Sequence, residues 1–332
     1  MDYQPEQLHE ADRNGPRITG TGTMIITPGF IGIDISKHHL DLFDSGCGRS
    51  ERVANGSEAI AALVERLRGR DVFVLFEATG RYDAALRRAL AAAAIRFARV
   101  NPARARDFAR ATGVLAKTDR IDARVLAAMA QSLAPAPAQQ DCPEREALLA
   151  AHRRRDQLVQ QRQQERARRS ECADPDLLAD IEAHLDWLDR RIAAWDAVIR
   201  DRIAASHRLQ RHARLLRSIP GFGPVATATL LALMPELGEL APGKIAALAG
   251  LAPFNVDSGQ SRGTRRIKAG RKRVRDALYM AALAAGRANP RFHTFYRRLR
   301  DAGKPAKLAL IALARKLLIV ANAVLRTQTQ FR

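Results

Sequence analysis

Lys117-Thr118-Asp119-Arg120-Ile121-Asp122-Ala123-Arg124 is the stretch from which the rest of the chain is best interpreted. It places two carboxylates, Asp119 and Asp122, three residues apart at the head of an apolar run with helical spacing. With Thr118 as the N-cap, both acids fall on one face of the first helical turns. Two acids on one face repel each other, and a helix N-terminus or a divalent cation relieves that repulsion. A solvated helix start with ordinary Asp–Arg pairs explains the same pattern, and only the residues upstream distinguish these two interpretations.

Two further carboxylates follow apolar segments upstream. Asp34 lies near the end of the strand-like run 30–36, and Glu77 directly follows the unbroken apolar run 72–76, which is typical of a buried central strand. The carboxyl edges of such strands are where α/β folds build their sites. A single strand-end Asp is usually a turn former. Four acids in this order instead predict a site for two Mg²⁺ ions with oxygen ligands.

The order of the segments predicts a mixed α/β layer fold for residues 29–133. Strands are expected at 30–36, 39–43, 72–76 and 95–100, with helices at 57–67 and 82–93, an Arg-rich helix from Pro102, and the opening stretch as the last helix. Residues 1–28 are polar without clear periodicity and are expected to form a flexible tail.

The chain changes character after a linker at 134–143, which contains Ala134-Pro135-Ala136-Pro137. Residues 144–206 predict a helical hairpin whose second helix starts at Asp174-Pro175. That helix carries an apolar seam in steps of three and four, formed by Leu178, Ile181, Leu185, Leu188, Ile192, Trp195 and Ile199. Such a coiled-coil arm is equally compatible with dimerisation and with pairing inside one chain.

Residues 207–332 predict a mostly α C-terminal domain. Gly221-Phe222-Gly223 resembles a helix-hairpin-helix turn, which exposes backbone N–H groups to a phosphate, although a plain Gly-rich connection between helices has the same pattern. Between Ser258 and Arg300 there are 13 Lys and Arg but one acid. The candidate nucleic-acid-binding residues are Gly221, Gly223, Arg262, Arg265, Arg266, Lys268, Arg271, Lys272 and Arg273.

The two halves of the chain differ in net charge. Residues 1–140 hold 19 Lys and Arg against 16 Asp and Glu, whereas residues 141–332 hold 36 against 19. This excess predicts a long polyanionic partner for the second half. The three cysteines form no pair and suit a reducing cytoplasm. No membrane partner is expected, because Arg315 and Lys316 interrupt the best apolar run, 308–325.

Three sequence blocks together resemble the DEDD-type transposases of bacterial insertion sequences, whose first domain has the RuvC resolvase and RNase H fold. The blocks are Gly32-Ile33-Asp34-Ile35-Ser36-Lys37, Phe76-Glu77-Ala78-Thr79-Gly80 and Lys117-Thr118-Asp119-Arg120-Ile121-Asp122-Ala123. The resemblance implies that Asp34, Glu77, Asp119 and Asp122 form a metal-binding tetrad for Mg²⁺.

The same family resemblance extends to the C-terminal domain through Gly250-Leu251-Ala252-Pro253, Asp257-Ser258-Gly259 and Arg262-Gly263. It implies that Ser258 is a nucleophile; Ser261 lies outside the match, and no His lies within it. It also implies target and donor DNA as substrates, a structured guide RNA, and dimers that assemble into a tetramer. The expected activity is metal-assisted DNA cutting and rejoining through a phosphoserine. The alternatives are a RuvC-type Holliday-junction nuclease that uses water, and a non-enzymatic nucleic-acid-binding protein.

Overall fold

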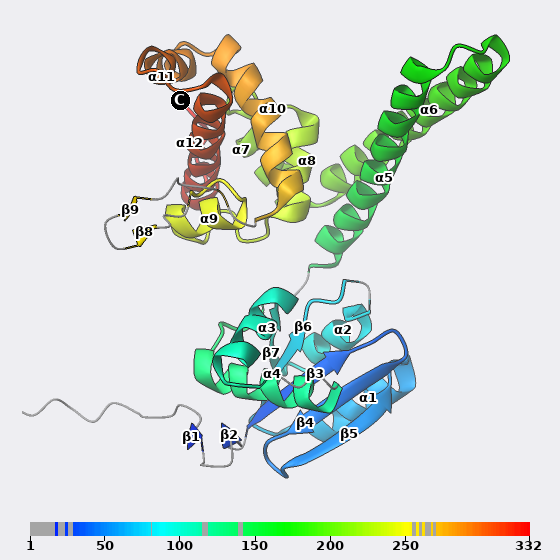
Figure 1. Ribbon diagram of the computed structural model, residues 1–332, viewed down its shortest axis with the longest axis vertical. Helices are drawn as coiled ribbons and strands as arrows, with labels where there is room; N and C mark the ends of the chain where they lie inside the picture. The colour runs from blue at the N-terminus through cyan, green and yellow to red at the C-terminus, as the bar shows by residue number, and fades with distance from the viewer. Residues whose placement is uncertain are drawn as a thin grey trace, which may run out of the picture. The chain divides into compact units, whose positions relative to one another are not determined.

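The computed structural model describes residues 17–18, 24–25, 29–80, 82–114, 119–138, 142–253, 257–258, 261–262, 267 and 270–332, with only the backbone at 17–18, 24–25, 119–120, 257–258 and 261–262. The chain divides into two compact units, Met1–Asp141 and Cys142–Arg332. Figure 1 shows the elements of each unit.

The first unit is built on a mixed five-stranded sheet, which confirms the predicted α/β class. In chain order the unit contains the short pair β1 (Arg17–Ile18) and β2 (Met24–Ile25), then β3 (Phe30–Ile35), β4 (His39–Asp44), β5 (Arg49–Ala54), α1 (Ser57–Leu67), β6 (Phe73–Glu77), α2 (Ala84–Ala92), β7 (Arg96–Val100), α3 (Pro102–Ala111) and α4 (Asp119–Leu133). The strand order is β5-β4-β3-β6-β7. β4 pairs antiparallel with β3 and β5, whereas β6 pairs parallel with β3 and β7. The tail predicted at 1–28 contains the β1–β2 pair, and its other residues lie outside the described chain.

The two faces of this sheet bury different partners, because successive side chains of a strand point to opposite faces. Ile31, Ile33 and Ile35 pack with the apolar sides of α1 and α2. The other face is covered by α4, where Leu126 and Met129 pack on Leu75.

Gly32 allows α4 to lie directly on β3. A Cβ placed on Gly32 would stand 1.9 Å from the carbonyl oxygen of Ala123 and 2.6 Å from the amide nitrogen of Ala127. No side chain fits at this point, so the backbone of the helix touches the backbone of the strand. This contact determines where the start of α4 lies on the sheet.

The second unit is helical and begins with a long antiparallel hairpin of α5 (Pro143–Glu171) and α6 (Pro175–Ala205). Asp174 caps α6 as predicted, because its side chain accepts hydrogen bonds from the amides of Asp176 and Leu177. Leu158, Leu188 and Ile192 are buried between the two helices. Cross-hairpin ion pairs join Arg155 to Asp196, Arg162 to Asp189 and Arg169 to Glu182. Within one chain the seam therefore serves the intramolecular pair.

The remaining helices share one core with the base of the hairpin. They are α7 (His207–Arg217), α8 (Pro224–Leu233), α9 (Pro242–Leu248), α10 (Lys272–Ala288), α11 (Pro290–Asp301) and α12 (Ala306–Thr327), and the short pair β8 (Asp257–Ser258) and β9 (Ser261–Arg262) lies between α9 and α10. The described pairing of β8 with β9 joins Asp257 to Arg262 and Ser258 to Ser261.

Helix α12 contains the apolar run 308–325. In the described chain, α12 alone is long and apolar enough to cross a membrane, in spite of Arg315 and Lys316. Leu313, Leu317 and Leu318 are fully buried in the core of the second unit. Its apolar character is thus explained by its place in that core.

Replacing Gly32 with Ala should destabilise the first unit by about 2–3 kcal/mol or more, since the added Cβ must push α4 off β3. Calorimetry of the full chain and hydrogen exchange of β3 would measure the loss. Gly56→Ser is the matched control, because a Cβ at this helix N-cap meets no atom within 4 Å. Equal stability of the two variants would contradict the contact.

Candidate functional site

Three acidic side chains lie on the α4 face of the sheet, at one level of three neighbouring strands. Asp34 follows Gly32 by two residues, and Glu77 follows Leu75 by two, so both share the face that α4 covers. The parallel register pairs Ile33 with Phe76 and therefore sets Asp34 beside Glu77. The antiparallel register sets Asp41 of β4 opposite Asp34 on the other side. The structure thus brings together two predicted carboxylates and a third that the sequence analysis missed.

Asp41 is buried with 5% of its surface exposed. Arg52, its neighbour on β5, donates from Nε and Nη2 to the two carboxylate oxygens, both at 2.9 Å. In the sequence, Asp41 is an acid between Leu40 and Leu42, in a strand where polar and apolar residues alternate. Only the register reveals that it stands next to Asp34.

The start of α4, in which the other two predicted acids occur, lies over this face of the sheet. Asp122 precedes Ala123, whose carbonyl lies over Gly32, and Asp119 is the first residue of the helix. The side chain of Asp119 lies outside the described residues. Asp34, Glu77 and Asp122 each have a further interaction in the structure. Among the described side chains, no three His, Cys, Asp or Glu form a metal-binding group.

The donor chemistry of this face nevertheless fits a hard cation. Asp34 and Glu77 offer only carboxylate oxygens, the ligands that Mg²⁺ prefers, and the helix start that carries Asp119 and Asp122 is held on the same face.

The segment that carries Ser258 begins and ends at a close backbone contact. A Cβ on Gly270 would stand 2.2 Å from the Cα of Gly250, and both glycines have positive φ, +88° and +69°. The amide of Arg271 also donates to the carbonyl of Leu248 at 2.9 Å. Ser258 therefore lies in a segment whose two ends meet, and its backbone pairs with that of Ser261. The side chains of Ser258 and Arg262, and all of Arg265, Arg266 and Lys268, lie outside the described residues.

Three of the basic residues predicted to bind nucleic acid have acidic partners within the chain. Arg271 binds Glu236 through two hydrogen bonds of 2.6 and 2.7 Å and also donates to the carbonyl of Leu233. Burial raises the pKa of Glu236, but the hydrogen bonds and charge of Arg271 outweigh burial and hold this pKa below its ordinary value. Lys272 pairs with Asp276 at 2.7 Å, and Arg273 pairs with Asp156 at 3.1 Å. Arg271 consequently has a structural role in the described chain.

The Gly221–Gly223 turn combines a packing role with an open helix end. A Cβ on Gly221, which has φ +89°, would stand 2.3 Å from the carbonyl of Ala281, so the turn packs tightly on α10. Gly223 is the N-cap of α8 and gives it no side-chain cap, and Pro224 follows at the first helical position. The first amides of α8 thus lack a capping side chain, which suits a phosphate.

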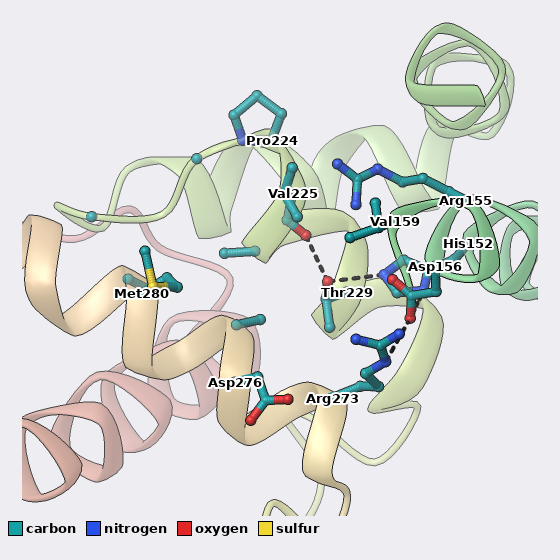
Figure 2. A pocket seen from close by; sticks show the side chains of 15 residues that line it. His152, Arg155, Asp156, Val159, Pro224, Val225, Thr229, Arg273, Asp276 and Met280 are labelled. Atoms are coloured by element: carbon teal, nitrogen blue, oxygen red, sulfur yellow. Dashed lines mark hydrogen bonds and ion pairs between the residues drawn. The ribbon is translucent and has the colours of Figure 1, made fainter. Parts of the chain in front are cut away.

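A cavity of about 420 Å³ lies beside this turn, between α5, α8 and α10 (Figure 2). At its wall His152, 3% exposed, shares a hydrogen bond of 2.9 Å between Nε2 and the Thr229 hydroxyl, which itself donates to the carbonyl of Val225. Asp156 lies 3.6 Å from Nδ1 of His152. Burial lowers the pKa of His152, and this outweighs the opposing charge of Asp156.

The buried imidazole should make the second unit less stable in mild acid. The folded state keeps His152 neutral, whereas the unfolded chain takes up a proton near the ordinary pKa of about 6.5. The unfolded state therefore binds more protons, and stability rises with pH up to about 6.5 and is lost below it. Denaturant unfolding between pH 5 and pH 8 should show this slope, reduced in His152→Gln. An unchanged slope in His152→Gln would refute the assignment.

Comparison with known proteins adds two family matches in chain order. A family model described as transposase, for the DEDD enzymes of IS110, matches residues 31–173. A second, described as the transposase IS116/IS110/IS902 family, matches residues 213–297. The first match contains the acidic face, and the second contains the Gly221–Gly223 turn and the Ser258 segment.

Several curated proteins are similar over part or nearly all of the chain. The 42 kDa protein of insertion element IS900 from Mycobacterium paratuberculosis is 38% identical over 42% of this chain and 35% of its own length. The 44.8 kDa protein of insertion element IS116 from Streptomyces clavuligerus is 34% identical over 47% of this chain and 38% of its own. The pilin gene-inverting protein of Moraxella lacunata is 28% identical over 91% of this chain and 97% of its own length.

Proposed function

We propose that this chain, which matches two models of the IS110-type transposases over residues 31–173 and 213–297, recombines DNA by cutting and rejoining strands through a covalent bond to Ser258. The family and the pilin gene-inverting relative support transposase or recombinase activity. The single observation that carries the catalytic assignment is the pair of carboxylates, Asp34 and Glu77, side by side beneath the start of α4.

The acidic face is the proposed metal centre. Asp34, Glu77, Asp119 and Asp122 would hold two Mg²⁺ ions, which supply charge neutralisation at a scissile phosphate. The strand order β5-β4-β3-β6-β7, with one antiparallel and one parallel half, supports the RNase H and RuvC-like fold expected for such a centre. In this arrangement the four carboxylates fix where a phosphodiester is cut.

The serine supplies the second half of the proposed chemistry. The Ser258 hydroxyl loses its proton and its oxygen attacks phosphorus. At the same time the bond from phosphorus to one bridging ester oxygen of the DNA breaks, and that oxygen takes up a proton and leaves as a free hydroxyl. The phosphoserine ester keeps the energy of the broken bond. A hydroxyl of another DNA strand then reverses the step, which releases Ser258 and joins the new strands without ATP.

The basic second unit is the proposed nucleic-acid interface. Its excess of positive charge supports contacts to the backbones of target and donor DNA, and of a structured guide RNA to which sequence choice would be delegated. The uncapped start of α8 at Gly223 supports a phosphate contact that does not read sequence. Dimers that pair into a tetramer would let the acidic face of one chain serve the Ser258 of another.

The proposal predicts a covalent DNA adduct that depends on both halves of the chain. Purified protein, element RNA, labelled target and donor DNA, and Mg²⁺ are mixed, denatured and separated on a gel. A DNA-linked protein band should appear with the wild type and fall at least about 100-fold in Ser258→Ala and in Asp119→Ala. Ser261→Ala is the matched control, because Ser261 is the cross-strand partner of Ser258.

Cleavage without an adduct, unchanged by Ser258→Ala, would refute the serine mechanism. It would instead favour a RuvC-type nuclease that uses water at the acidic face, with a DNA-binding second unit. Recombination that proceeds without Mg²⁺ and with Asp119→Ala would remove the metal centre from the mechanism.

A further inference from the structure

We propose that the ion pair between the buried Asp41 and Arg52 is a positioning element of the metal centre, which sets the charge that Asp34 presents to a cation. This inference rests on the metal centre proposed above and concerns two residues outside the predicted tetrad. The pair belongs to the same level of the sheet as Asp34 and Glu77, so its charge acts on the site at close range.

The geometry places four charged side chains in one row across the sheet. From the edge inwards they are Arg52 of β5, Asp41 of β4, Asp34 of β3 and Glu77 of β6. All four share the α4 face, because Phe43 packs under Ala123 and Ala127 while Val53 belongs to the opposite face. Directly opposed residues on neighbouring strands have Cβ atoms about 4.5–5.5 Å apart.

The pair resolves an electrostatic conflict in this row. Three carboxylates side by side would repel one another, and a buried acid without a partner is costly. Arg52 donates to both oxygens of Asp41, and the two charges cancel next to Asp34. Loss of one partner therefore leaves a net charge beside Asp34, positive or negative according to which partner is removed.

A merely structural pair behaves differently. Arg52 lies on the edge strand β5 with 51% of its side chain exposed, so the pair could serve only to hold β5 on β4. In that case removal of either partner would lower stability in the same direction, and metal affinity would stay unchanged. The sign of the effect on metal affinity thus separates the two roles.

The experiment measures binding of Mg²⁺, and of Mn²⁺ as a second probe, to the full chain by isothermal titration calorimetry without nucleic acid. Asp41→Asn should weaken binding about three- to tenfold, because it removes a negative charge beside Asp34 while the positive charge of Arg52 stays. Arg52→Gln should strengthen binding by a similar factor, because Asp41 then adds negative charge. The double variant, which restores neutrality, should return to within about twofold of the wild type.

Arg66→Gln is the matched control. Arg66 forms the same kind of bidentate pair with Glu51, but on the α1 face of the sheet, so its loss should leave metal affinity unchanged. Arg52→Gln removes a half-exposed side chain and keeps the test usable if Asp41→Asn does not fold.

Two outcomes would overturn the inference while leaving the metal centre in place. They are wild-type metal binding that neither variant changes, and shifts of both single variants in the same direction. Failure of the wild type to bind either cation, together with recombination that needs no divalent metal, would instead overturn the metal centre itself.

Discussion

The first unit depends on the backbone contact between Gly32 of β3 and the Ala123 turn of α4. A side chain at position 32 would lift the helix by the thickness of a methyl group or more. Because there is none, the start of α4 lies against the strand that carries Asp34, and Asp34 and Asp122, far apart in sequence, belong to elements in direct contact. The acidic site is thus a consequence of close helix–strand contact as much as of the acids themselves.

The second unit is strongly basic, so its fold has to withstand repulsion between like charges. Many arginines of the described chain are joined to carboxylates within the unit: Arg155 to Asp196, Arg271 to Glu236, and Arg273 to Asp156. These pairs stiffen the hairpin and the start of α10 without removing the net positive charge. The remaining excess stays available for a polyanion.

Much of the first unit was predictable because its signals are local. The helix expected at 57–67 is α1 with those bounds, and the apolar run 72–76 is β6 shifted by one residue. Asp174 as the cap of α6 was readable for the same reason. The Asp41–Arg52 pair was not, because it depends on strand register, and the Arg271–Glu236 pair joins residues far apart in sequence. A count of basic residues cannot tell which of them find a carboxylate inside the fold.

The contact between Gly250 and Gly270 has a consequence for how this protein can vary. Because Gly250 and Gly270 touch, the chain enters and leaves the segment between them at the same place, whatever the length of that segment. Lengthening such a closed loop costs little, about 0.6 kcal/mol for each doubling. Helices α9 and α10 would keep their places while residues 251–269 gain or lose length. The positions of α9 and α10 therefore depend little on the length of this segment and are anchored by the two glycines, whereas Leu251 in the core and the proposed nucleophile Ser258 constrain its sequence.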